Sequence, residues 1–111
     1  MTDLINLTQA IYQKAKEIDQ EKKDLEKLAK DKAIAEREYR MALAEAIFEL
    51  KANGYAATLI SDLARGSVAE LKFQRDLADC CFTAKRESLQ ASLANLTALQ
   101  SVLRIQREVG E

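Results

Sequence analysis

The sequence predicts an all-α protein, a long antiparallel helical hairpin that resembles a coiled coil and has a short helix in its connecting turn. Its 111 residues contain no proline and only three glycines, two of them within Asn53–Ser67. Most of the remaining residues are good helix formers such as Ala, Leu, Lys and Glu. We therefore expect one domain over residues 1–111, with a helix over about 3–52, a turn over about 53–67 and a helix over about 68–108.

The first helix has the pattern of a coiled-coil seam. Leu4, Ile11, Ile18 and Leu25 share one heptad position, and Leu7 and Leu28 occupy the position three residues further on. Thr2 or Asp3 is the expected N-cap. Beyond Leu28 the apolar pattern is shifted by one residue, which predicts a stutter with seam residues at Ala29, Ala33, Leu43, Ile47 and Leu50.

The turn is predicted to begin at Gly54, because glycine adopts the left-handed conformation that commonly ends a helix. Ser67 followed by Glu70 has the pattern of a capping box at the start of the second helix. Between them, Ala56–Ala64 has the pattern of a short amphipathic helix. Its apolar residues either close the end of the hairpin or, with their neighbours, bind a partner through Tyr55, Leu59, Ile60 and Arg65, which include residue types enriched at hot spots.

The second helix has no charged residue from Ser88 to Leu103. A helix that is uncharged over four turns is expected to be covered on more than one side. If facing residue numbers add to about 120, the first helix covers one side with Glu17–Lys32, and we expect a second copy to cover another. Two hairpins would then form a dimeric antiparallel four-helix bundle. The expected self-association residues are Phe82, Leu89, Leu93, Leu96, Leu99 and Leu103.

Charge and hydropathy exclude several classes of interaction. Seventeen basic and eighteen acidic residues leave a net charge of -1, so no overall field attracts nucleic acid or anionic lipid. The sequence lacks an 18-residue apolar run and the pattern of a signal peptide, which predicts a cytoplasmic protein. We interpret Cys80 and Cys81 as small apolar residues at or near a packed face of a reduced protein, with a redox switch or an intermolecular disulfide as alternatives.

Catalysis is not expected. The chain has no histidine, so it lacks Ser-His and Cys-His pairs, and Glu36, Glu38 and Glu45 lack the histidines of di-metal bundles. We expect no cofactor and no metal. A helix-turn-helix over residues 58–77 is disfavoured, because acidic residues accompany Lys72 and Arg75 on the supposed recognition helix.

Residues 36–109, and above all the segments AATLISDLARG and LQSVLRIQ, resemble a group of small uncharacterised proteins encoded in phages and prophages of Gram-positive bacteria. The resemblance implies an accessory factor that acts on a host or phage protein inside the bacterial cell. We therefore expect a protein-binding module in DNA metabolism. The alternatives are an inhibitor of a host defence or nuclease complex, and a helical dimer that binds nucleic acid through its tip and Lys22, Lys23, Lys27 and Lys30.

Overall fold

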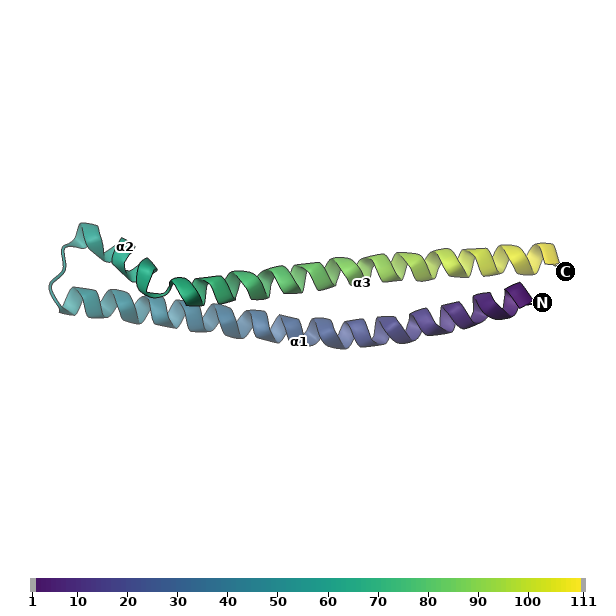
Figure 1. Ribbon diagram of the computed structural model, residues 1–111, viewed down its shortest axis with the longest axis horizontal. Helices are drawn as coiled ribbons and strands as arrows, with labels where there is room; N and C mark the ends of the chain where they lie inside the picture. Colours follow the sequence, from purple (N-terminus) through teal and green to yellow (C-terminus); the bar gives the residue numbers. More distant parts are fainter. Residues whose placement is uncertain (1, 111) are drawn as a thin grey trace. The chain divides into compact units, whose positions relative to one another are not determined.

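The computed structural model describes residues 2–110, and all the regular structure in this range is helical. Helix α1 spans Thr2–Ala52, α2 spans Ala57–Ser67 and α3 spans Ala69–Gly110. α1 and α3 run antiparallel, with α2 in the connection between them (Figure 1). The predicted hairpin with a short helix in its turn is therefore confirmed. Thr2 and Asp3, the expected N-caps, lie within α1, and none of the described helices could cross a membrane.

The described chain comprises two compact units, and both contain parts of α1 and α3. Unit 1 consists of residues 2–26 of α1 and residues 83–110, which belong to α3. Unit 2 consists of residues 27–82, which include the end of α1, all of α2 and the beginning of α3.

In unit 1 the two helices pack through the predicted heptad seam. Ile18 of α1 and Leu89 of α3 are the most buried apolar residues, with exposed fractions of 4% and 9%. Most of the α3 side chains that are buried or half-buried in this unit recur at intervals of four and three residues; they are Lys85, Leu89, Ser92, Leu96, Leu99 and Leu103. Three of these positions lie on one heptad register with Phe82, as predicted. Thr83 and Ser101 are also half-buried. The seam also holds polar residues, which an apolar pattern alone does not reveal.

In unit 2 the predicted shift of the seam after Leu28 is wrong at its first two residues, whereas Leu43, Ile47 and Leu50 are half-buried as predicted. Ala29 and Ala33 are exposed, whereas Lys32 and Tyr39 are half-buried and continue the earlier heptad spacing. The pattern was misleading because these seam residues are not aliphatic. Lys32 is accommodated by an ion pair with Asp79, and its ammonium group lies 4.9 Å from the centre of the Phe82 ring.

The pairing of the two long helices also differs from the prediction. A sum of about 120 would place Glu36 opposite Ala84, but Glu36 instead pairs with Arg75, and in unit 1 Glu21 pairs with Ser92. The prediction treated all of residues 53–67 as the turn. The structure completes the reversal within residues 53–56, so α2 is already the first segment of the returning chain. This early reversal moves the pairing by about two turns of helix.

The reversal itself follows the predicted glycine signal. Gly54 has a φ of 81°, the left-handed conformation that glycine adopts without a Cβ clash. The Gly54 N–H donates to the Lys51 carbonyl at 3.1 Å, and the Tyr55 N–H donates to the Leu50 carbonyl at 3.2 Å. These two bonds form a Schellman motif, which satisfies the last carbonyls of α1.

The predicted capping box at the start of α3 is not formed. Ser67 is the last residue of α2, and its hydroxyl donates to the Ala64 carbonyl at 2.8 Å. The Glu70 carboxylate accepts a hydrogen bond from Gln74 instead of reaching back to Ser67. Only Val68 separates α2 from α3, and its φ of -112° and ψ of 18° interrupt the helical geometry. One non-helical residue therefore replaces the expected cap.

Candidate protein-interaction surface

Only some of the apolar residues of α2 pack against the rest of unit 2. Ile60, Ala64 and Val68, the residue after the helix, follow one another at intervals of four and are 8%, 0% and 6% exposed. This spacing places them on one side, where they pack within unit 2. Ile60 was predicted to contact a partner, but its burial removes it from the accessible surface.

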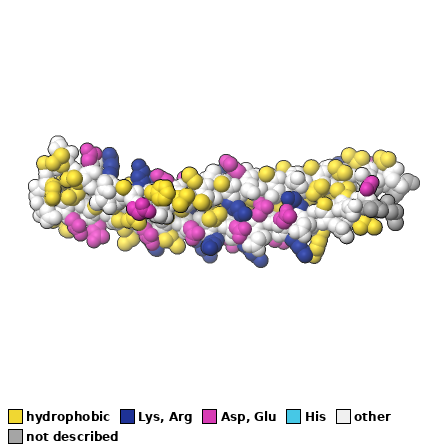
Figure 2. Space-filling model, in the orientation of Figure 1, with side chains coloured by type: hydrophobic (Ala, Val, Ile, Leu, Met, Phe, Trp, Pro, Cys, Tyr) yellow, Lys and Arg dark blue, Asp and Glu magenta, His cyan; other side chains and the backbone are white. Residues whose placement is uncertain are grey.

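The outer side of α2 and Tyr55, which lies two residues before the helix, remain apolar and accessible. Tyr55, Leu59 and Leu63 are 49%, 53% and 44% exposed. We call these three residues the tip surface, and Figure 2 shows hydrophobic side chains gathered at the α2 end of unit 2. Because fully burying a leucine stabilises by about 1.5–3 kcal/mol, the two leucines leave much of that stabilisation unused within the chain.

A groove between α1 and α2 adjoins the same helix. It has a volume of about 330 Å³ and is lined by Leu43, Ile47, Lys51, Ala57, Ile60, Ser61 and Arg65. Lys51 and Arg65 add two cations to a mostly apolar lining. The Arg65 side chain is 72% exposed, and its Nη1 lies 4.0 Å from Asp62. Leu43 and Ile47 were predicted as seam residues, and the structure adds that this pair, four residues apart, helps to line a groove.

The residues predicted for self-association mostly face the interior of the hairpin. Leu89 is buried, whereas Phe82, Leu96, Leu99 and Leu103 are half-buried. Only Leu93, at 41% exposed, leaves a large apolar surface accessible. The heptad stripe was correctly identified, but these residues largely pack within the chain and hold its two long helices together.

An ionic cluster in unit 2 links α1 to α3. The Arg75 guanidinium lies 4.4 Å from the centre of the Tyr39 ring, and its Nε lies 3.6 Å from Glu36 Oε2. The Arg75 Nη2 donates to the neighbouring Asp76 at 3.0 Å. This hydrogen bond, together with the nearby acidic charges, raises the pKa of Arg75 above its usual value. The cluster is a structural link, because its cation is already paired with two carboxylates and an aromatic ring.

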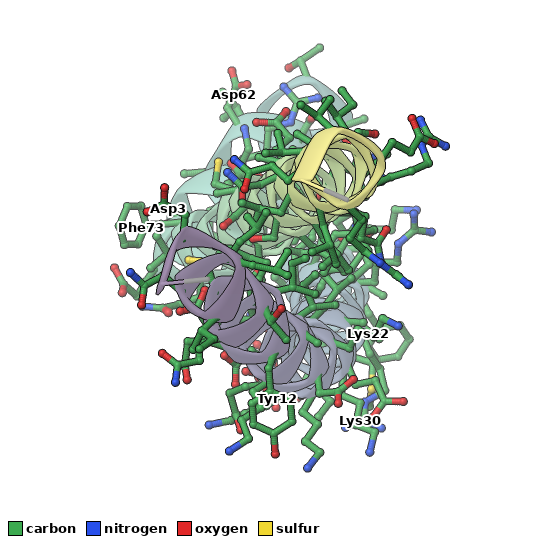
Figure 3. The ribbon with its side chains drawn as sticks, turned by 90° about the vertical axis from the view of Figure 1, so that its right-hand side faces the viewer. Asp3, Tyr12, Lys22, Lys30, Asp62 and Phe73 are labelled. Atoms are coloured by element: carbon green, nitrogen blue, oxygen red, sulfur yellow. The ribbon has the colours of Figure 1, made fainter. Side chains whose placement is uncertain are left out.

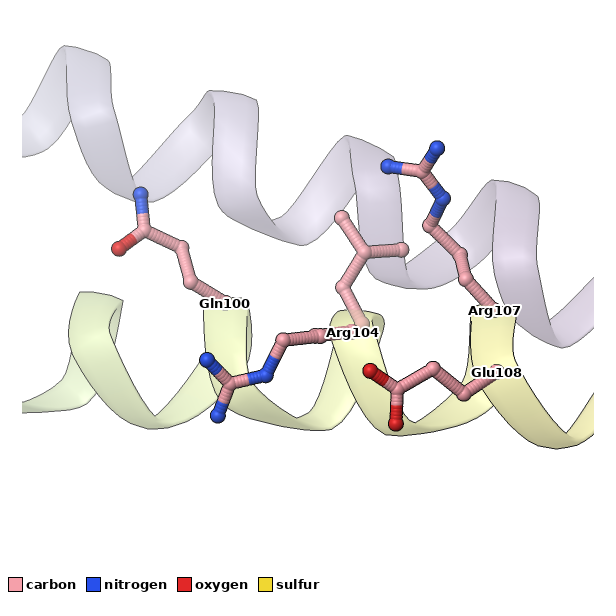
Figure 4. Close-up of a pocket in the computed structure, with 5 residues that line it drawn as sticks. Gln100, Arg104, Arg107 and Glu108 are labelled. Carbon is pink, nitrogen blue, oxygen red and sulfur yellow. The ribbon is translucent and has the colours of Figure 1, made fainter.

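A second hollow lies in unit 1 near the end of α3. Its volume is about 460 Å³, and its lining residues are Gln100, Leu103, Arg104, Arg107 and Glu108. Gln100 and Arg107 extend toward α1, whereas Arg104 and Glu108 lie along the face of α3 that is turned to the viewer (Figure 4). Two arginines could attract an anion, but Glu108 places a carboxylate in the same hollow.

The remaining candidate residues are accessible but do not form a metal site. Lys22, Lys23, Lys27 and Lys30 are exposed, and Figure 3 shows Lys22 and Lys30 projecting away from the helices. The thiols of Cys80 and Cys81 are free and exposed, so neither cysteine lies in the packed face itself, although Phe82 beside them is half-buried. Among residues 2–110, no group of three or more acidic, cysteine or histidine side chains could hold a metal ion.

Comparisons with protein-family models, with curated proteins and with solved structures found no match to this chain. The resemblance to phage and prophage proteins therefore stays a prediction.

Proposed function

We propose that the chain is a non-catalytic protein-binding module, a phage-type accessory or regulatory factor that contacts a protein partner in DNA metabolism through its tip surface. The single observation that supports this proposal is the second apolar side of α2. Ile60 and Ala64 already provide the contacts that α2 needs within unit 2, yet Leu59 and Leu63 remain about half exposed. A cluster of apolar side chains that stays accessible to solvent, and does not pack within the chain, is typical of an interaction site.

The chemistry of this region fits a protein partner. Tyrosine and arginine are enriched among the residues that dominate binding energy, and Tyr55 and Arg65 flank the apolar residues of α2. A partner that buries Leu59 and Leu63 would gain the stabilisation that folding leaves unused. The exposed cations of Lys51 and Arg65 favour acidic residues on that partner.

The test is affinity capture from nuclease-treated bacterial lysate with a matched pair of variants. The tip variant carries Leu59→Gln and Leu63→Gln, and the control variant carries Met41→Gln and Phe73→Gln, which are also exposed apolar residues of unit 2. We expect both variants to keep the helical circular dichroism spectrum of the wild type. The tip variant should capture at least about tenfold less of the partner, as expected for loss of two hot-spot contacts. Equal capture by the wild type and the tip variant would refute the proposal.

The same capture separates the alternative functions. Recovery of a nuclease or defence enzyme whose activity falls on binding would identify an inhibitor. The exposed lysines at 22, 23, 27 and 30 favour nucleic acid as the second candidate partner. In that case retention of nucleic acid from untreated lysate would fall steeply with salt concentration, because phosphate contacts release counterions.

We also propose that the protein self-associates, most simply as a homodimer. The uncharged part of α3 supports this proposal, because α1 packs against one side of α3 and leaves other uncharged residues exposed. Self-association and partner binding would then use different surfaces, with the tip surface in unit 2 free for the partner.

A further inference from the structure

The exposed part of α3 in unit 1 carries a second seam with heptad spacing. Val102, Ile105 and Val109 are 44%, 55% and 81% exposed, and exposed small or polar residues precede them at the same spacing. Intervals of four and three residues connect all eight positions, which are Ala84, Ser88, Ala91, Asn95, Ala98, Val102, Ile105 and Val109. We call these residues the outer seam. None is charged, although Lys85, Arg86, Glu87, Arg104, Arg107 and Glu108 occupy other positions of the same segment.

The outer seam lies beside the seam that packs on α1, not opposite to it. At about 100° per residue, the line through Ser88 and Ala91 is about 100° around α3 from the line through Leu89 and Ser92. A helix in a four-helix bundle contacts two neighbours at about a quarter turn from each other. α1 occupies one of these two positions, and the outer seam provides a surface for the other.

We infer that the outer seams of two copies pack antiparallel against each other, so that α3 of one copy contacts α3 of the second. This inference rests on the proposed self-association. It adds which surface the two copies share and that their α3 helices run antiparallel. A dimer with two-fold symmetry brings each residue opposite a fixed partner position, in both directions. If the seams overlap fully, Ala84 lies opposite the second copy's residue 109, and Ala91 lies opposite its residue 102.

The side-chain volumes favour this direction. The first half of the seam is small, with Ala84, Ser88 and Ala91, and the second half is large, with Val102, Ile105 and Val109. Antiparallel packing places each small residue opposite a large one, which fills the space between two helices. A parallel arrangement would place alanine opposite alanine and leave voids between the helices. Such voids lower the stability of the dimer because the side chains around them lose packing contacts.

The size of the seam indicates a reversible dimer. A strip of about 25 residues is about 38 Å long and about 10 Å wide, which is about 380 Å² of projected area per copy. The accessible area of a ridged helix surface is larger than its projected area. Stable dimers bury about 800 Å² of accessible surface per partner, so this interface is at the small end of those that form stable dimers. We therefore expect a dissociation constant in the micromolar range, with monomers and dimers in exchange.

Sedimentation equilibrium from about 5 to 500 µM tests the self-association. The monomer mass is 12.4 kDa, and we expect the wild type to approach twice this mass at the highest concentrations. The seam variant carries Ala91→Glu and Ala98→Glu, and the control carries Gln90→Glu and Thr97→Glu, which lie on another exposed face of α3. The seam variant should remain monomeric and helical, and the control should dimerise. A monomeric wild type at 500 µM would overturn self-association itself, whereas dimerisation of the seam variant would overturn only the outer seam.

Disulfide formation between single-cysteine variants tests the direction. Both variants carry Cys80→Ser and Cys81→Ser, and one adds Ala91→Cys while the other adds Val102→Cys. A disulfide requires Cα atoms within about 7 Å, whereas positions 91 and 102 are about 16 Å apart along one helix. An antiparallel dimer should cross-link the mixed sample and leave each variant alone uncross-linked. Cross-linking of each variant with itself would show a parallel dimer and overturn the inferred direction.

Discussion

The Ser92 hydroxyl donates a hydrogen bond of 2.9 Å to Glu21 Oε1, while Glu21 Oε2 is buried without a hydrogen-bond partner. This pair joins α3 to α1 at a seam position of unit 1 where leucine would be the usual residue. A carboxylate with one satisfied oxygen is a poor stabiliser of a helix pair, because the other oxygen has lost its water. The pair nevertheless favours one alignment of the two helices, since Glu21 has its donor only opposite Ser92.

Replacement of the polar pair by apolar residues should stabilise the protein. We expect Glu21→Leu combined with Ser92→Ala to raise the free energy of unfolding by about 1–3 kcal/mol, because no polar group then remains unpaired at the seam. Ser92→Ala alone should lower it by about 1–3 kcal/mol, since Glu21 Oε1 then loses its donor and neither carboxylate oxygen has a hydrogen-bond partner. Urea unfolding at one protein concentration measures both effects. A double variant that is less stable than the wild type would contradict this account.

Arg75→Lys should weaken the contact between α1 and α3 in unit 2. Lysine keeps the positive charge but cannot stack its head group on Tyr39 while it also contacts Glu36. We expect a lower melting temperature, with a smaller difference at high salt because part of the contribution is ionic. Arg37→Lys, at an exposed position of α1, is the matched control and should melt with the wild type. Equal melting temperatures for all three proteins would show that the ionic cluster contributes nothing.

Gly54→Ala should destabilise the hairpin by about 1–2 kcal/mol, because alanine in the left-handed conformation places its Cβ close to the carbonyl oxygen. Apart from Gly54 itself and its two chain neighbours, no residue has an atom within 4 Å of the position that a Cβ would occupy, so this cost comes from the local backbone alone. Gly66→Ala is the opposite case, since Gly66 lies in α2 with equally open surroundings. It should stabilise by about 0.4–1 kcal/mol. Thermal unfolding of the two variants should therefore give shifts of opposite sign.

Two neighbouring residues of α2 should respond very differently to truncation. Ile60→Ala removes a buried side chain and should cost about 2–4 kcal/mol. Leu59→Ala removes a side chain that is 53% exposed and should change the stability by less than about 0.5 kcal/mol. Chemical unfolding measures both values. Similar losses for the two variants would mean that Leu59 also packs within the protein, and the tip surface would lose its main support.

The helices could be predicted because their signals are local. The heptad spacing of Leu4, Ile11 and Ile18 requires only neighbouring residues, and Gly54 ends α1 through its own backbone conformation. The pairing of α1 with α3 could not be predicted in the same way. It depends on where the reversal is complete, and the sequence of α2 is compatible both with a cap on the hairpin and with the first segment of the returning chain.

The candidate surfaces were predicted in part. The spacing of Leu59, Ile60 and Leu63 indicates an amphipathic helix, but periodicity does not show which of these residues faces α1. On α3, heptad spacing identified the stripe through Leu89 and Leu96 but could not distinguish packing within the chain from packing between copies. The outer seam was missed because five of its eight residues are small or polar, so it contributes little to an apolar pattern.

The division into two units has a consequence for the order in which the chain folds on the ribosome. Unit 2 is continuous in sequence, so it can form as soon as residue 82 has emerged. The α1 segment of unit 1 must wait for residues 83–110, which takes about 1–6 s at a synthesis rate of about 5–20 residues per second. During this interval Ile11 and Ile18 have no partner helix to bury them. We therefore expect unit 2 to form before unit 1 during synthesis.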